Sequence, residues 1–340
     1  MKAAMTEIVG NDALRARLAR DILDHTLPHA LILEGPRGTG KHTIATMCAA
    51  SLACTEHRNE HLPIPCLTCL DCKKILEKKS PDVIVIGTEG KATIGVETIR
   101  FLKEDVHTVP NDLDYKIYII EDADRMTSQA QNALLLTLEE PPSYVHFFLL
   151  CENAGLLLET IRSRAPTLRT EPLSEEEIDR YLVSHDKRAA QMKLAAPRDF
   201  SVLLKTSGAG IGQALEYLEP SAFSPILEKR ALISETVTCA IYHRDPLPLL
   251  SRYSSKRDVL REQLMCLLDA LRDLLLLKKS ETVPLAFFVD RNEAIDLCDR
   301  VSLPFLYRFF EAVQKALDDN ARNANVRLLL MRMLNDSTLI

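Results

Sequence analysis

The sequence contains no tryptophan, and aromatic residues make up only 5% of its 340 positions. Proteins that bind single-stranded nucleic acid by base stacking need such side chains, so we expect no stacking platform here. The chain also lacks an excess of positive charge, because its formal net charge is −6. No global basic field therefore draws it to nucleic acid, and any contact with DNA is expected to be local or to be made by partner proteins.

Long apolar runs are absent as well. No stretch reaches the roughly 20 apolar residues that a helix needs to span a bilayer. Residues 1–24 mix charges throughout and lack the apolar core of a signal peptide. We therefore expect a cytoplasmic protein without a membrane segment. Its 340 residues, 46% hydrophobic and 26% charged, suggest an ordinary globular chain of about two or three domains.

The chain does contain a glycine-rich loop between an apolar run at residues 30–33 and a helical pattern at residues 44–50. Gly35 to Lys41 fits the sequence G-x-x-x-x-G-K, which binds phosphate when it joins a strand to a helix. Backbone N–H groups at the helix N-terminus form the anion cradle, and the lysine adds a charge for the outer phosphates. The predicted nucleotide-binding residues are Gly35, Gly38, Gly40, Lys41, His42 and Thr43.

One position of this loop departs from the usual pattern. Magnesium prefers oxygen ligands, and a Ser or Thr hydroxyl normally follows the lysine. Here that residue is His42, which offers no oxygen. Thr43 is one residue further along the helix, about 100° around its axis, so it does not substitute directly. The sequence therefore predicts a site for ATP or ADP in which the placement of Mg²⁺ is compromised.

An acidic pair, Glu121 and Asp122, follows a strand-like run at residues 115–120. In nucleotide hydrolases an Asp at this place helps to hold magnesium, and a further polar residue orients the attacking water. The usual order is Asp then Glu, whereas this chain has the reverse. The exchange moves each carboxylate by roughly 1.5 Å, and a misplacement of about 1 Å can cost about 100-fold in rate. We interpret the pair as a degenerate catalytic site.

Four cysteines follow the loop helix with the spacing C-x11-C-x2-C-x2-C, at Cys54, Cys66, Cys69 and Cys72. In a cytoplasmic protein such a cluster favours a metal over disulfides. Four thiolates suit a closed, tetrahedral structural zinc site. His57 and His61 lie between the first two cysteines and are alternative ligands, although four cysteines are already sufficient.

The remaining pattern predicts an α/β region followed by helices. Further strand-like runs occur at residues 82–86 and 146–151, and helical patterns occur at residues 12–26, 94–106 and 128–140. This alternation is typical of a mostly parallel sheet that binds its ligand at the carboxyl ends of the strands. The last third contains leucine-rich helical patterns at residues 260–278, 305–317 and 326–334, which predict an all-helical domain.

Together these features resemble the bacterial replicative clamp loader subunits of the AAA+ class, over about residues 8–218. The carrying residues are His29-Ala30, Gly35 to Lys41, the four cysteines, residues 121–126, 132–135 and 138–142, and Ser163-Arg164. The resemblance implies an AAA+ phosphate-loop domain at residues 1–170 with a zinc module at 54–72. It also implies a small helical lid at 171–220 and a helical collar at 221–340 that holds five subunits together.

Arg164 gains a role only from this resemblance, because an arginine in a loop is otherwise most simply a surface residue. Ser163-Arg164 is similar to the family's Ser-Arg-Cys motif, whose arginine reaches the nucleotide of the neighbouring subunit. Here the third residue is Ala165. The stretch from Gly210 to Leu215 resembles the sensor region of the lid but lacks the arginine that motor subunits carry there.

Motor subunits of this family carry a hydroxyl residue after the loop lysine and Asp-Glu after the strand. The resemblance therefore implies a non-motor subunit with little ATPase activity of its own, within the DNA polymerase III holoenzyme. Its implied partners are the motor subunits and delta in a hetero-pentamer, with contact to the sliding clamp and primed DNA through the complex. The alternative is an active ATPase, either a clamp loader motor subunit or another AAA+ protein.

Overall fold

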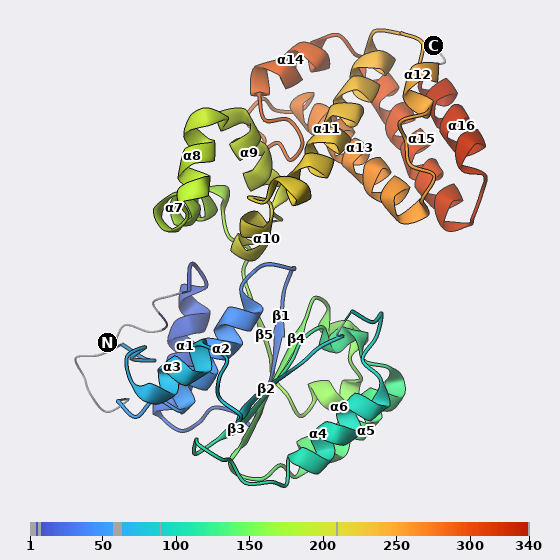
Figure 1. Cartoon of the computed structure of the whole chain (residues 1–340). Helices are drawn as coiled ribbons and strands as arrows, with labels where there is room; N and C mark the ends of the chain where they lie inside the picture. The colour runs from blue at the N-terminus through green and yellow to red at the C-terminus, as the bar shows by residue number, and fades with distance from the viewer. Residues whose placement is uncertain (1–4, 6–7, 57–62, 89, 209, 339–340) are drawn as a thin grey trace. The chain divides into compact units, whose positions relative to one another are not determined.

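The computed structural model describes residue 5 and residues 8–56, 63–88, 90–208 and 210–338. The chain forms two compact units, one of Met1–His185 with Ser207–Leu215 and one of Asp186–Thr206 with Glu216–Ile340. Both units are drawn in Figure 1. The chain thus crosses between them three times, and each unit is described by itself below.

The first unit is built on a five-stranded sheet with the order β2-β3-β4-β1-β5, in which every pair is parallel. The strands are β1 (Ala30–Glu34), β2 (Val83–Ile86), β3 (Lys116–Ile120), β4 (Val145–Cys151) and β5 (Thr167–Arg169). All of β3 and β4 and most of β1 are buried, which explains why their sequences are continuous apolar runs rather than alternating ones. The expected α/β fold with a parallel sheet is confirmed.

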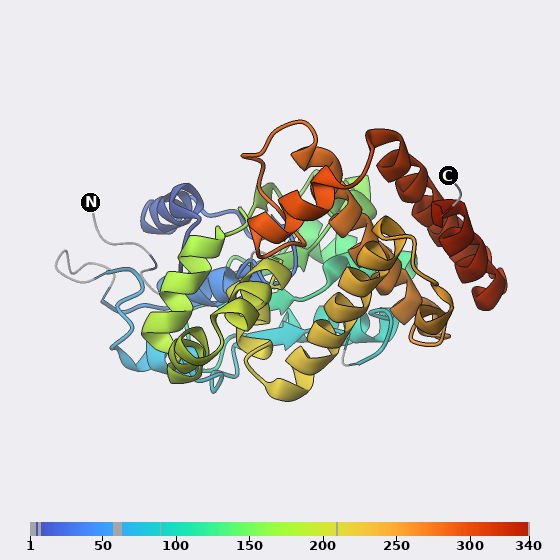
Figure 2. The same ribbon diagram turned by 90° about the horizontal axis from the view of Figure 1, so that it is seen from above.

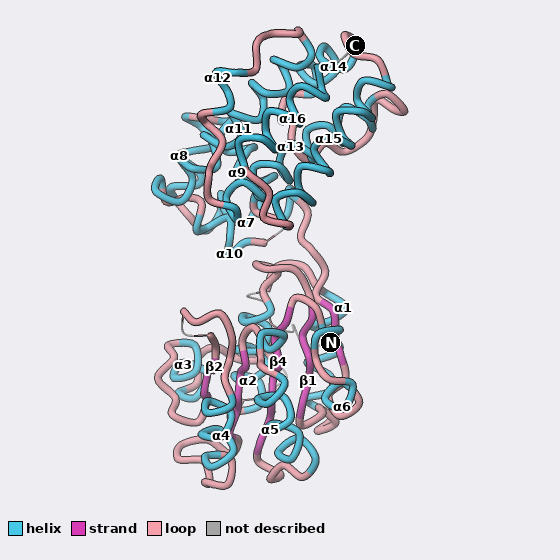
Figure 3. The backbone as a smooth tube through the Cα atoms, turned by 90° about the vertical axis from the view of Figure 1, so that its right-hand side faces the viewer, coloured by secondary structure: helices cyan, strands magenta, loops and turns pink. Residues whose placement is uncertain are grey.

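Helices cover both faces of this sheet. On one face lie α1 (Asp12–Leu23), α2 (Lys41–Leu52) and α3 (Leu70–Leu76), and on the other lie α4 (Val96–Asp105), α5 (Ser128–Glu139) and α6 (Glu159–Arg162) (Figure 1). Each face has its own apolar core between helices and strands. The strands run side by side with the helices around them (Figure 3).

The strand and helix positions expected from the sequence in this unit are found within a few residues. For example, α5 starts after Thr127, whose hydroxyl accepts the N–H of Ala130, and it ends directly before Pro141. A short polar cap and a proline stop are both local signals. The short strand β5 was not expected, because three residues with a single buried Leu168 form no recognisable pattern.

The second unit is helical throughout its described residues. Its helices are α8 (Lys187–Ala195), α9 (Pro197–Thr206), α11 (Pro220–Ile241), α12 (Leu247–Leu250), α13 (Arg257–Leu277), α14 (Arg291–Asp299), α15 (Leu303–Ala321) and α16 (Val326–Thr338). Two further helices lie at crossings between the units: α7 (Glu175–His185) ends at the first crossing, and α10 (Ile211–Glu216) contains the last. The expected C-terminal helical region is confirmed.

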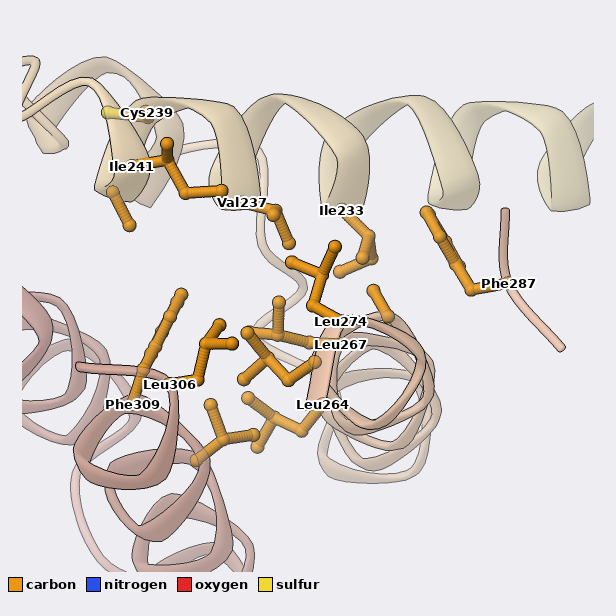
Figure 4. Packing of buried hydrophobic residues seen from close by; sticks show 14 of the residues in the cluster. Ile233, Val237, Cys239, Ile241, Leu264, Leu267, Leu274, Phe287, Leu306 and Phe309 are labelled. Carbon is orange, nitrogen blue, oxygen red and sulfur yellow. The ribbon is translucent and has the colours of Figure 1, made fainter. Parts of the chain in front are cut away.

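The helix α13 lies at the centre of this unit. Its buried residues Leu264, Leu267 and Leu274 pack between α11 and α15, opposite Ile233 and Leu306 (Figure 4). The last two helices, α15 and α16, lie side by side (Figure 2). Among the described helices, none has the length and apolar character needed to cross a lipid bilayer.

Candidate functional site: a phosphate-loop pocket and a cysteine cluster

The glycine-rich loop opens a pocket of about 640 Å³ at the carboxyl end of β1. Gly38 and Gly40 have φ values of 84° and 83°, a left-handed conformation that glycine adopts without strain. The helix α2 begins directly after them at Lys41, so its N-terminus faces the pocket. The acidic, basic and histidine side chains that line the pocket are Arg37, Lys41, His42, Glu121, Asp122, Arg125 and Glu152.

Two other glycines allow close backbone approaches around the loop. A Cβ on Gly35 would lie 2.0 Å from Oγ1 of Thr170, which in turn lies 2.8 Å from Oγ1 of Thr39. A Cβ on Gly210 would lie 2.5 Å from the carbonyl carbon of Gly38. Gly210 therefore packs directly on the phosphate loop within the same compact unit.

Lys41 lies against the loop that it follows. Its Nζ donates hydrogen bonds to the carbonyl oxygens of Gly35 at 2.6 Å and Pro36 at 2.8 Å. Burial lowers the pKa of Lys41, whereas nearby acidic groups, Glu152 first among them, raise it and only partly offset this effect. Its ammonium group is thus held at the pocket by backbone oxygens.

His42 and Glu121 are brought together in the same pocket. The buried Nδ1 of His42 lies 2.7 Å from Oε1 of Glu121, without the alignment of a regular hydrogen bond. This contact lowers the pKa of Glu121, although burial acts in the opposite direction. The Glu121 carboxylate therefore stays charged. It lies beside an imidazole rather than among the oxygen ligands that a cation would need.

The other carboxylates near the loop have different environments. Asp122 lines the pocket in a left-handed conformation with φ of 49°. Oδ2 of Asp124 accepts the backbone N–H groups of Glu152 at 3.1 Å and Asn153 at 3.2 Å. One oxygen of Asp124 is thus used to hold the chain after β4 rather than to face a ligand.

Arg164 is not among the residues that line this pocket. It follows α6 and precedes β5, whose Thr167 is opposite Ile32 in the middle of β1. The phosphate loop begins after the far end of β1, and each strand residue adds about 3.3 Å. Nη2 of Arg164 instead lies 2.6 Å from Oε1 of Glu139, and Nη1 donates to the carbonyl oxygen of Thr160 at 3.0 Å.

The four cysteines of the predicted metal site also come together. The Sγ atoms of Cys54, Cys66, Cys69 and Cys72 all lie within 4.8 Å of one another. Thiolates at about 2.3 Å from one zinc ion would lie about 3.8 Å apart, so this cluster needs only a small contraction to hold a tetrahedral metal ion. His57 and His61, the alternative ligands, lie outside the described residues.

Backbone groups orient these thiols. The N–H of Cys69 lies 3.3 Å from Sγ of Cys66, and the N–H of Cys72 lies 3.4 Å from Sγ of Cys69. Burial would raise the pKa of Cys66, but hydrogen bonds led by the Cys69 N–H lower it to about 6. Metal binds the thiolate form, and burial raises the pKa of Cys54 and Cys72. The closeness of the four sulfur atoms is therefore what fits a metal ion.

Residues far apart in the sequence contact the phosphate loop and Arg164. No individual role was predicted for Glu139, Thr170 or Gly210, because the sequence around them contains no pattern that indicates one. Glu139 lies in the Leu-Glu-Glu-Pro-Pro stretch that also carries the resemblance, which was its only available signal. Thr170 and Gly210 act through close contacts that sequence spacing does not reveal.

Residues 10–174 match the protein family described as "DNA polymerase III, delta subunit". The chain is 36% identical over 170 residues to the DNA polymerase III subunit delta′ of Bacillus subtilis, with coverage of 50% of each protein. It is 33% identical over 176 residues to subunit gamma of Buchnera aphidicola, with coverage of 52% of this chain and 47% of the relative. The chain thus spans about half the length of these curated relatives.

Solved structures give weaker similarities over a longer stretch. A gamma subunit-related protein of Thermotoga maritima is 23% identical, with a TM-score of 0.44, over 95% of this chain and 98% of that one. The clamp loader delta protein of Bacillus subtilis is 12% identical, with a TM-score of 0.35, over 95% of this chain and 99% of that one.

Proposed function

We propose that this chain is a delta-prime-like subunit of a replicative clamp loader, because residues 10–174 match the family described as "DNA polymerase III, delta subunit" and the chain is similar to curated delta′ and gamma subunits. In this proposal it works in the cytoplasm beside motor subunits and delta in a hetero-pentamer that loads the sliding clamp onto primed DNA. Residues 1–170 form the AAA+ domain, 171–220 act as a lid, and 221–340 join the collar of the complex.

The position of Arg164 is the observation that carries this proposal. The guanidinium is not part of the lining of its own phosphate-loop pocket. Arg164 precedes the first residue of β5, whereas the phosphate loop follows the last residue of the parallel strand β1. A third of the Arg164 side chain is exposed. An arginine that served its own nucleotide would have to lie in that pocket. Arginine suits a role in trans because its planar fork donates two parallel hydrogen bonds to phosphate oxygens and stays charged.

The chain's own pocket supports a non-motor role. His42 stands where a magnesium ligand is needed, and it engages Glu121 at 2.7 Å. Neither residue is then available for hydrolysis in the manner of a motor subunit. The alternative, an active motor subunit, is favoured by the loop itself and by the comparable identity to subunit gamma of Buchnera aphidicola, whereas the contact between His42 and Glu121 argues against it.

We assign zinc to the cysteine cluster. Four cysteine sulfurs in a closed, largely buried group match the donor set of structural zinc sites. The cluster joins the ends of the segment between α2 and α3, where the metal would fix the fold of this insertion. It lies away from the phosphate loop in the sequence, and we assign it no part in catalysis.

The decisive experiment uses a reconstituted clamp loader that carries Arg164→Ala in this chain. An arginine supplied in trans is worth about 10³ to 10⁵ in rate in GTPase activation. We therefore expect hydrolysis at one neighbouring site to fall by about 10³-fold, while complex assembly and zinc content stay unchanged. The readouts are DNA- and clamp-stimulated ATPase activity and clamp loading.

Arg162→Ala provides the matched control, because Arg162 is an exposed arginine at the end of α6, two residues before Arg164. That variant should retain wild-type activity. Unchanged turnover at every site in the Arg164→Ala complex would show that Arg164 is an ordinary surface arginine.

A further inference from the structure

We propose that the phosphate-loop pocket binds a nucleoside polyphosphate without Mg²⁺, with His42 occupying the place of the metal. This inference rests on the part of the proposed function in which the pocket binds nucleotide. It does not depend on the role of Arg164.

The protein ligands that magnesium needs are missing from the loop. Mg²⁺ demands near-octahedral oxygen coordination and is usually held by one or two protein oxygens together with substrate phosphates. The residue after Lys41 is an imidazole, and the next hydroxyl, on Thr43, belongs to a solvent-exposed residue. No side-chain oxygen therefore stands at the first turn of α2 in the position required.

The carboxylate nearest to that position is already engaged. Oε1 of Glu121 lies 2.7 Å from Nδ1 of His42, and this contact lowers the pKa of the Glu121 carboxyl. A metal ion would have to displace the imidazole to reach this oxygen. On Asp124, Oδ2 is occupied by two backbone N–H groups. These two carboxylate oxygens are thus engaged by protein groups rather than free for Mg²⁺.

The same pocket nevertheless retains what a phosphate chain needs. The N-terminus of α2 and the loop N–H groups remain, and such a terminus binds anions by itself. Lys41, Arg37 and Arg125 line the pocket and supply positive charge that a divalent cation would otherwise provide. His42 also lines the pocket and contacts the Glu121 carboxylate at 2.7 Å.

The test measures binding rather than turnover. The purified full chain is titrated with a fluorescent ADP analogue, once with excess EDTA and once with millimolar Mg²⁺. We expect the two dissociation constants to agree within about threefold. Lys41→Ala should weaken binding at least tenfold in both buffers, because it removes the ammonium from this pocket.

His42→Thr provides the complementary change, since it restores the hydroxyl and releases Glu121. In this variant Mg²⁺ should strengthen binding at least tenfold, as expected for a site that gains oxygen ligands. Thermal melting verifies that the variant is folded. Because 34% of the His42 side chain is exposed, we expect the fold to tolerate this substitution.

A tenfold or greater gain from Mg²⁺ in the wild-type chain would overturn the inference. So would the absence of measurable binding in EDTA, or equal binding by the wild type and Lys41→Ala. These failures leave the proposed role of Arg164 intact, because that role is measured at the neighbouring subunit's site.

Discussion

Nη2 of Arg164 lies 2.6 Å from Oε1 of Glu139, and this ion pair joins the end of α6 to the end of α5. The two side chains are 34% and 43% exposed, so the pair contributes at most about 1 kcal/mol to stability. Such a contact does little for folding. It fixes the direction of a long side chain that our proposal requires to meet a phosphate on another subunit.

Glu139 should therefore act as a positioning residue for Arg164. We expect Glu139→Ala to lower kcat at the neighbouring site about three- to tenfold, because a loosely placed arginine loses rate, while KM for ATP stays unchanged. Glu139→Gln, which still offers a hydrogen-bond acceptor, should recover part of the loss. ATPase kinetics of the reconstituted complex measure both constants.

Glu140→Ala is the control for this experiment, since Glu140 is the exposed acidic neighbour at the end of α5. It should behave as the wild type. Suppose that the Glu139→Ala and wild-type complexes have equal rates while the Arg164→Ala complex is impaired. Glu139 would then not position Arg164, and the role of Arg164 itself would stand.

The cysteine cluster predicts the zinc content of the purified protein. Protein purified under reducing conditions should contain one zinc ion per chain, and Cys69→Ala should lose it, because a structural site needs its four ligands. Cys266→Ala is the control, since Cys266 lies in the second unit outside the cluster. Elemental analysis decides the matter, and a wild-type chain free of zinc would refute the assignment.

Removal of the metal should loosen the segment between α2 and α3 without unfolding the sheet. The strands form their core with α1 and α2 and with α4 to α6 on the other face, and most of that core does not involve the cysteines. Limited proteolysis after chelation should cut near the cluster first. Collapse of the whole unit on chelation would show that the metal supports more of the fold than we infer.

The isolated chain should release phosphate from ATP at a rate close to background. His42 in place of a hydroxyl and the reversed Glu121-Asp122 order both act against hydrolysis. His42→Thr alone should restore little turnover even where it creates a dependence of binding on Mg²⁺, because the acidic pair keeps its order. A steady-state assay that finds several turnovers per second in the wild type would favour the motor alternative.

Asp82 should determine part of the pH dependence of stability. Its fully buried carboxylate accepts backbone N–H groups from Asn111 at 2.7 Å, Asp112 at 2.7 Å and Leu113 at 2.9 Å. Burial would raise the pKa of Asp82, but these three hydrogen bonds prevail and hold it below its ordinary value. The folded state therefore favours the charged form.

The sign of this effect follows from linkage. A depressed pKa gives stability that is present above the unfolded value of about 3.9 and is lost as the pH falls through the folded value. Asp82→Asn should cost about 2–4 kcal/mol at pH 7, and the difference from the wild type should narrow below about pH 4. Urea denaturation at the two pH values measures this, and the exposed Asp114→Asn serves as the control.

Local signals account for what the sequence predicted well. The loop from Gly35 to Lys41, the helical pattern at residues 128–140 and the cysteine spacing each involve neighbouring residues, and the structure contains the loop, the helix and a cluster of the four sulfur atoms. The partner of Arg164 is 25 residues away in the chain, and Thr170 is 135 residues from Gly35. Such pairs depend on how the strands are ordered in the sheet, which no short pattern specifies.

The close approach of Gly38 and Gly210 limits which amino acids can occupy these two positions. A Cβ at position 210 would lie 2.6 Å from Cα of Gly38, and one at position 38 would lie 3.2 Å from Cα of Gly210. Neither position can acquire a side chain unless the backbone of the other moves away. Among relatives that keep this arrangement, we therefore expect the two glycines to be retained or replaced together, as a linked pair 172 residues apart in the sequence.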